Sequence, residues 1–197
     1  GASVLIMGLS GNAILPQITS LARKPDPAQA ERTLREALAT SIAQMGPEHT
    51  TVAQIRIALG AMLLAQERAD EALENVAHGT RVLISQRSRE QNLADVVFIS
   101  AIRMLAQIHM AQHARPPPPE ILELLPDAAE AIHVSAMLPP LAKTEAALVL
   151  AEAMALSGQP AAARAALERA TTLMPSLPET DAPHFRSRRD HIIGLLK

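Results

Sequence analysis

Residues 150–175 read LAEAMALSGQPAAARAALERATTLMP, and this stretch decides the fold class of the chain. Apolar residues recur in it at helical spacing on either side of a Ser-Gly-Gln-Pro turn. They are Leu150, Ala151 and Met154 before the turn and Ala163, Leu167 and Ala170 after it, with Pro175 at the end. The stretch therefore predicts two antiparallel helices that pack through small side chains.

The same spacing occurs a second time in residues 59–79, which read LGAMLLAQERADEALENVAHG. The corresponding positions are Leu59, Gly60, Leu63, Ala72, Val76 and Gly79. Repetition of this kind is typical of helical repeat arrays, whose units bury their apolar faces only by stacking on neighbours. The pattern predicts an all-α fold, an α-solenoid of antiparallel helix pairs with a capping helix at its C-terminal end.

The composition supports this prediction and excludes several classes of function. Apolar residues make up 48% of the 197 residues, but there are only two Phe and no Tyr or Trp, so small and aliphatic residues must build the core. A formal charge of -2 gives no basic field for nucleic acid or an anionic membrane surface. The lack of cysteine removes disulfides, thiolate catalysis and Cys-based zinc sites, which fits a cytoplasmic location.

Residues 1–15 are expected to lie outside the repeat domain. Residues 1–3, Gly-Ala-Ser, look like the remnant of a cleaved expression tag, so we expect a domain excised from a longer protein. The apolar residues that follow are too few and too interrupted to span a bilayer, and no membrane contact is expected. They also resemble the start of a phosphate-binding loop, but Asn12-Ala13-Ile14 replaces the Gly-Lys-Ser that such a loop needs.

A single repeat domain is expected over residues 16–197. Its units are residues 16–45, 50–87, 92–137 and 141–175, and the cap is residues 181–197. The first unit is expected to end in a helix over residues 28–45, and the second to consist of a helix capped by Thr50 or Thr51, a turn at 66–68 and a helix over 69–85. In the third unit, helices are expected to begin near Asn92 or Asp95 and at Pro119 or Glu120. The fourth unit is expected to consist of helices over 141–156 and 161–174, and the cap to begin at Asp181. Pro and Gly residues, such as Gly46-Pro47, mark most of these boundaries.

The third unit contains an insertion with consecutive prolines at residues 116–119. These prolines allow only extended or polyproline conformation, and the turn is about ten residues longer than in the other units. We interpret the insertion as a tolerated surface loop. The alternative is a ligand for a proline-reading domain, or a loop that folds over a groove. The helix after it is expected to pack through Ala128, Ile132 and Ser135.

Candidate chemistry in the sequence is weak. His109 and His113 share a helical face and have the spacing of two metal ligands, but no third ligand is near in sequence and His109 occupies a packing position. Asp181, His184, Ser187 and His191 have the residue types of a hydrolytic set, but nothing indicates an oxyanion site. In the cap, Phe185, Ile192, Leu195 and Leu196 are expected to face the array, and Arg186, Arg188, Arg189 and Asp190 to face solvent or an acidic partner. No catalytic, cofactor-binding or metal-binding residue is predicted.

The repeated positions resemble the tetratricopeptide repeat family over about residues 28–175. Units of that family carry a Leu-small pair and a large apolar residue on the first helix, then small, apolar and small residues on the second. Leu105, Ala106, His109, Ala128, Ile132 and Ser135 fit once the insertion is allowed, and Ala30, Leu34 and Ala37 fit half a unit. The Leu-small pairs are roughly 45 residues apart, beyond the standard repeat of about 34, which is similar to the kinesin-light-chain variety found in bacterial signalling proteins.

The resemblance implies that a protein or peptide binds along the concave wall formed by the first helices. The positions it implies are Gln54, Ile57, Ala61 and Leu64, then Ser100, Arg103, Gln107 and Met110, then Glu145, Leu148, Glu152 and Ala155. Ile57, Ala58 and Ala61 cannot hold a terminal carboxylate as the chaperone-binding members do, and the groove asparagines of kinesin-light-chain repeats are missing. Neither ligand is carried over.

The sequence thus leads to three hypotheses for function. The first is a non-catalytic protein–protein interaction module, the partner-binding or regulatory part of a larger bacterial protein such as a kinase or a transcription regulator. The second is a ligand-sensing or enzymatic helical domain that uses the concave groove, which would need polar groups converging in a pocket. The third is a homo-oligomerisation domain, for example a homodimer formed by stacked ends.

Overall fold

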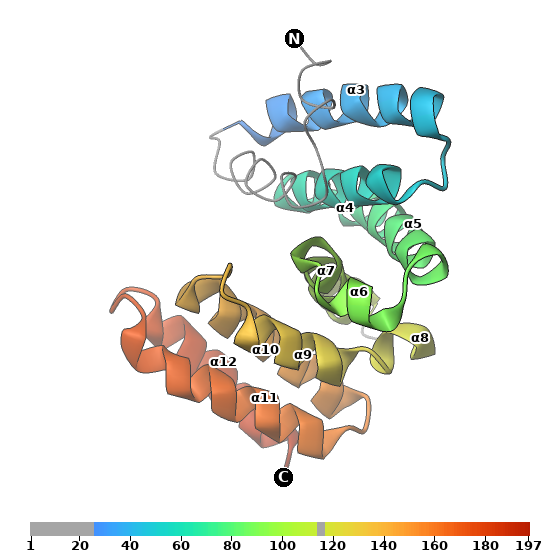
Figure 1. The fold of residues 1–197 in the computed structure, drawn as a ribbon. Coiled ribbons are helices and arrows are strands. Elements are labelled where there is room, and N and C mark those ends of the chain that lie inside the picture. Colours follow the sequence, from blue (N-terminus) through green and yellow to red (C-terminus); the bar gives the residue numbers. More distant parts are fainter. Residues whose placement is uncertain (1–25, 114–116) are drawn as a thin grey trace. The chain divides into compact units, whose positions relative to one another are not determined.

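The computed structural model describes residues 26–113 and 117–197, and these residues form helices and turns without a strand. The all-helical class predicted from the sequence is confirmed for them. The chain divides into two compact units, residues 1–104 and 105–197. Figure 1 shows the order of the helices along the chain. The sequence prediction of one domain over residues 16–197 stays a prediction.

The first unit begins with α3 (Pro27–Met45), which lies along α4 (Thr50–Ala65). Asp26 caps α3 because its carboxylate accepts hydrogen bonds from the N–H groups of Ala28 and Gln29, and Pro27 has no N–H to satisfy. The helix ends at Gly46, whose φ of 86° is a conformation that favours glycine. Both boundaries lie within one residue of the prediction.

The cap of α4 is His49 and not Thr50 or Thr51, so the predicted cap is wrong. The Nδ1 atom of His49 accepts a hydrogen bond of 3.1 Å from the N–H of Thr51. Thr50 is already the first helical residue. An imidazole nitrogen can act as the acceptor that the first turn requires, although His is not among the residues usually preferred there.

The tightest packing in the first unit joins α4 to α5 (Ala69–Gln86). A Cβ atom added at Gly79 would lie 2.6 Å from the carbonyl oxygen of Ala53, and one added at Gly60 would lie 2.3 Å from Val76 Cγ2. Glycine lowers helix stability by about 1 kcal/mol relative to alanine. The close approach that these two glycines allow offsets that cost, because it brings the backbones of α4 and α5 into contact.

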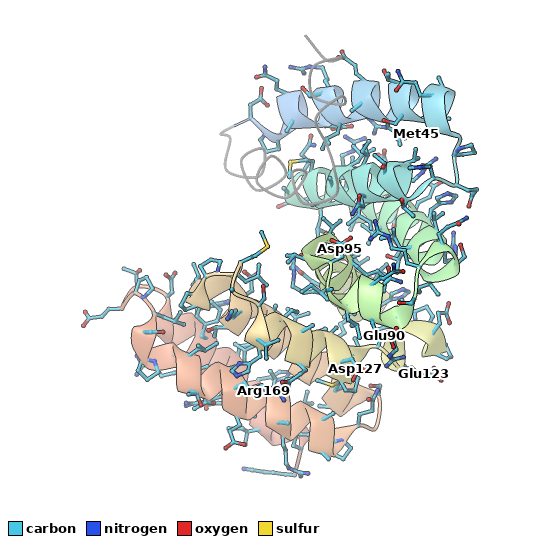
Figure 2. The ribbon with its side chains drawn as sticks, in the orientation of Figure 1. Met45, Glu90, Asp95, Glu123, Asp127 and Arg169 are labelled. Carbon is cyan, nitrogen blue, oxygen red and sulfur yellow. The ribbon has the colours of Figure 1, made fainter. Side chains whose placement is uncertain are left out.

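The unit continues through a short helix that the sequence did not predict. Ser88 and Gln91 form a capping box at the start of α6 (Arg89–Leu93). Asp95, labelled in Figure 2, precedes α7 (Val96–His113), and its Oδ1 accepts a hydrogen bond from Val97 N–H at 2.9 Å. The division between the units falls within α7, between residues 104 and 105.

In the second unit, the helix predicted after the prolines is interrupted. It consists of α8 (Pro119–Leu122) and α9 (Leu125–Val134). Pro126 explains the break, because it lacks an N–H group and suits the first turn of a new helix. Ala128 and Ile132 are buried as predicted. Ser135 lies beyond the end of α9, so its predicted place on the packing face of the helix is wrong.

The remaining helices are α10 (Pro140–Leu156), α11 (Pro160–Leu173), the 3-10 turn η1 (Met174–Ser176) and α12 (Ala182–Leu195). The helix α12 packs mainly on α10, with Phe185 and Ile192 buried. Leu195 was expected to face the other helices, but it is the last helical residue and 39% of its surface is exposed. Within the described residues, no helix has both the length and the apolar character needed to cross a membrane.

Each unit has a core of mainly aliphatic side chains with almost no solvent exposure. The largest fully buried residues of the first unit are Ile57, Leu59, Leu63, Leu83, Phe98, Ile99 and Ile102. Those of the second unit are Ile108, Leu125, Leu148, Leu150 and Met154. Burial of each such side chain contributes about 1.5–3 kcal/mol, so these residues stabilise the fold of both units.

Candidate functional site

The predicted contact residues of the first unit have different environments. Gln54 and Ile57 on α4 each expose only 2% of their surface, so they belong to the interior. Leu64 on α4 and Ser100 and Arg103 on α7 are half-buried. Ala61, the remaining predicted position on α4, is half-buried too, so a partner can directly reach these four residues but not Gln54 or Ile57.

Gln54 is buried because it completes a polar cluster between α4 and the start of α7. Its Nε2 donates a hydrogen bond of 2.8 Å to Asp95 Oδ2, and Arg87 Nη1 donates to the same oxygen at 2.7 Å. The other carboxylate oxygen of Asp95 caps α7 through Val97. Asp95 is half-buried, and a carboxylate removed from part of its solvent needs such partners because desolvation without them is costly. Gln54 thus fixes the position of a helix, a role that a repeat pattern cannot distinguish from a contact role.

In the second unit, the predicted residues again divide by exposure. Leu148 on α10 is fully buried, whereas Glu145 on the same helix is exposed. Gln107 and Met110 on α7 and Glu152 on α10 are half-buried.

Glu152 is bound by the C-terminal helix. Its Oε2 lies 3.4 Å from Arg188 Nη2, and its Oε1 lies 3.6 Å from His191 Nε2. The prediction that Arg188 faces solvent is therefore wrong, because Arg188 is half-buried and paired with α10. The helix predicted as a simple cap also contributes charged groups beside one of the predicted contact residues.

The candidate chemistry found in the sequence is not assembled by the described residues. No group of three His, Cys, Asp or Glu side chains in them could hold a metal ion. His109 is half-buried rather than buried. The side chain of His113 and the residues around Asn12 lie outside the described part of the chain. His184 packs edge-on against Phe185, with ring centroids 5.6 Å apart.

A second polar cluster, centred on Glu31, connects α3 to the turn between α4 and α5. The Glu31 carboxylate accepts hydrogen bonds from Arg35 at 2.8 Å, Gln66 at 2.9 Å and Arg68 at 2.8 Å. Burial raises the pKa of Glu31, but the hydrogen bonds from Gln66, Arg35 and Arg68 outweigh it and hold the pKa below its ordinary value. Glu31 is therefore a charged structural link.

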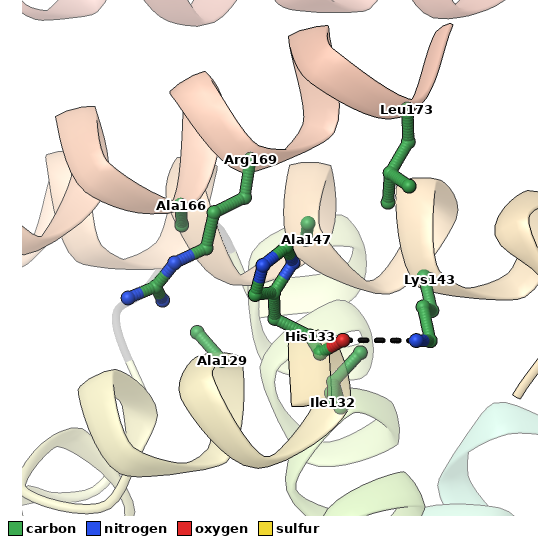
Figure 3. Close-up of a pocket in the computed structure, with 8 residues that line it drawn as sticks. All are labelled: Ala129, Ile132, His133, Lys143, Ala147, Ala166, Arg169 and Leu173. Atoms are coloured by element: carbon green, nitrogen blue, oxygen red, sulfur yellow. Dashed lines mark hydrogen bonds between the residues drawn. The ribbon is translucent and has the colours of Figure 1, made fainter. Parts of the chain in front are cut away.

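A shallow hollow in the second unit is lined by side chains of α9, α10 and α11 (Figure 3). The hollow is open to solvent and has no enclosed space large enough for a water molecule. Its nitrogen-bearing side chains are His133, Lys143 and Arg169, one from each helix, and the rest of its lining is apolar. Sequence reasoning did not find these residues, since each comes from a different helix and no spacing pattern connects them.

Comparison of the chain with models of protein families, with curated proteins and with solved structures finds no match. The fold and the sites described above are therefore the basis for assigning a function.

Proposed function

We propose that this chain is an α-solenoid interaction module of the tetratricopeptide repeat type, which binds a protein or peptide along its first helices. The observation that carries the proposal is the burial of both copies of the repeated sequence pattern. Leu59, Gly60, Leu63, Ala72, Val76 and Gly79 are buried, and so are Leu150, Ala151, Met154, Ala163, Leu167 and Ala170. Two stretches that share a pattern thus use the same positions for packing.

The contacts of the two glycines support antiparallel pairing. Gly60 lies against Ala72 and Val76 at the start of α5, whereas Gly79, further along α5, lies against Ala53 near the start of α4. In an αα-hairpin the two helices are antiparallel, so residues near the end of the first helix contact the start of the second, and residues near the start of the first contact the later part of the second. The short turn at residues 66–68 is consistent with this arrangement.

The proposed contact surface consists of the predicted positions that solvent reaches. In the first unit they are Ala61, Leu64, Ser100 and Arg103, and in the second unit they are Gln107, Met110, Glu145, Glu152 and Ala155. Of these residues, Arg103 and Met110 are of types that are enriched at protein–protein interfaces. Gln54, Ile57 and Leu148 support the helices from inside and are not part of the proposed surface.

A photo-crosslinking amino acid placed at Leu64 and at Glu145 tests this proposal. Matched controls carry it at Glu74 on α5 and Glu168 on α11, which are exposed residues of second helices. In lysate of the organism that encodes the chain, one protein should be crosslinked from the first two positions and from neither control. Equal capture from all four positions would refute the proposed surface, and crosslinking only to a second copy would favour homo-oligomerisation instead.

Once the partner segment is known, its affinity for charge-reversed chains gives a quantitative check. We expect Glu145→Lys to weaken binding by about tenfold or more, a loss of about 1.4 kcal/mol. The matched change Glu168→Lys should leave the affinity within about twofold. An unchanged affinity for both variants would place the binding surface elsewhere.

A further inference from the structure

The turn that joins α3 to α4 (residues 46–49, Figure 1) carries a side chain whose contact depends on its protonation state. His49 caps α4 because its Nδ1 accepts the hydrogen bond from Thr51 N–H at 3.1 Å, which places the proton of the neutral ring on Nε2. A protonated imidazole has a donor on both nitrogens and accepts no hydrogen bond. Its positive charge is also unfavourable at the N-terminus of a helix. The cap of α4 therefore exists only while His49 is neutral.

The preceding residue, Glu48, makes a contact with the opposite dependence. Its Oε1 lies 3.5 Å from Nε2 of His78 on α5, but the two atoms form no hydrogen bond, and Nε2 is buried without a partner. Protonation gives the His78 ring a positive charge and a donor on both nitrogens, so that Nε2–H can donate to the Glu48 carboxylate. An ion pair between the turn and α5 therefore exists only while His78 is protonated.

Other charged groups are few around the two histidines in the described part of the chain. On α4 the charged residue is Arg56, and one turn from His78 on α5 itself are Glu74 and Arg81. Residues 37–45, the second half of α3, have no charged or titratable side chain. The short helix α6 contacts α5 at Leu83, more than one turn beyond His78. Glu48 is therefore the acidic group that the structure places at ion-pair distance from His78.

We propose that the turn at residues 46–49 is a proton-operated switch, which is held to α4 by His49 at neutral pH and to α5 by His78 in acid. The turn has room to move, because residues 47–49 are exposed and nothing lies within 4 Å of the position where Gly46 would carry a Cβ atom. Histidine is the side chain that changes charge between about pH 5 and 8, so both contacts change in that interval. As the pH falls, the stability from the cap is lost and the stability from the ion pair is gained. None of these residues belongs to the proposed protein-binding surface, so the switch is independent of that surface.

Hydrogen exchange of the full chain, measured by NMR at about pH 8 and about pH 5, tests the contact with α4. The protection of Thr51 N–H, relative to the unfolded chain at the same pH, should fall about fivefold in acid as the cap is lost. In His49→Asn, which keeps an acceptor at every pH, the protection should stay constant. His184→Asn, which changes an exposed histidine of α12, is the matched control and should behave as the unmodified chain does. Equal protection at both pH values in the unmodified chain, or the same fall in His49→Asn, would overturn the proposal.

Urea unfolding of Glu48→Gln at the same two pH values tests the contact with α5. Because the amide has no charge to pair with the protonated His78, the equilibrium constant for unfolding should rise about threefold at pH 5 and stay within about twofold at pH 8. Glu74→Gln removes an exposed carboxylate on the same helix as His78 and is the matched control, which should change the constant less at pH 5 than Glu48→Gln does. An effect of Glu48→Gln that is equal at both pH values would show that acid does not bind the turn to α5, and the switch would be refuted.

Discussion

At the scale of single residues, glycines have opposite roles in this chain depending on what surrounds them. Gly79 lies against the backbone of α4, whereas nothing lies within 4 Å of the position where Gly194 would carry a Cβ atom. Helix propensity favours alanine at both positions, since both glycines are helical. The effect of an alanine substitution on stability should therefore differ between the two positions because of packing.

Gly79→Ala is expected to lower the free energy of unfolding by about 1–3 kcal/mol, because the added methyl group meets the Ala53 carbonyl oxygen, which cannot rotate away. The matched change Gly194→Ala should raise it by about 0.5–1 kcal/mol through helix propensity alone. Urea unfolding monitored by circular dichroism measures both. Equal effects of the two substitutions would show that α4 and α5 are not in close backbone contact.

The cap of α4 gives a second prediction at this scale. His49→Ala removes the acceptor for Thr51 N–H and should cost about 1 kcal/mol, whereas His49→Asn retains an acceptor and should preserve stability. Thr50→Ala is a suitable control, as Thr50 does not cap the helix. If Thr50→Ala lowered the free energy of unfolding more than His49→Ala, the result would favour Thr50 as the cap, as predicted from the sequence.

At the scale of elements, a buried and a half-buried carboxylate connect helices that are separate in sequence. Glu31 connects α3 to Gln66 and Arg68 in the turn before α5, and Asp95 connects α4 to α7. Such groups are stabilising only while their partners are present, because a buried charge left alone is costly. The strength of the Glu31 link should therefore depend on pH.

The pKa of Glu31 is lower in the folded chain than its ordinary value of 4.5. A lowered folded-state pKa contributes stability above the unfolded-state pKa, and this contribution is lost as the pH falls through the folded-state value. Glu31→Gln should thus destabilise the chain by about 1–3 kcal/mol at pH 7 and much less in acid. Glu71→Gln, which removes a half-exposed member of the same cluster, should cost less than about 1 kcal/mol. A pH-independent effect of Glu31→Gln would contradict the charged link.

At the scale of the whole molecule, the chain consists of two compact units joined within α7. Each unit has its own buried core, so we expect local stability to vary along the chain. Hydrogen exchange measured by mass spectrometry should reveal this in Gly79→Ala, where protection falls in α4 and α5 and is retained in α10 and α11. Uniform loss of protection across all helices would indicate one cooperative unit instead.

The sequence by itself determined the helical class, most helix boundaries and the positions of close packing. These properties are local: Pro and Gly restrict the backbone wherever they occur, and apolar spacing defines one face of a helix. The burial of Leu59, Gly60 and Gly79 and of their counterparts Leu150, Ala151 and Ala170 follows from that spacing.

Only the tertiary structure decided which predicted contact residues remain accessible. Gln54 is buried and donates a hydrogen bond to Asp95, which also binds Arg87. Leu148 is buried in the core of the second unit. Glu152 forms an ion pair with Arg188. The tertiary structure also brings His133, Lys143 and Arg169, from three different helices, to the lining of one hollow. The physical reason is that burial and ion pairing depend on side chains from distant parts of the sequence, and a repeat pattern defines a helix face without identifying what covers it.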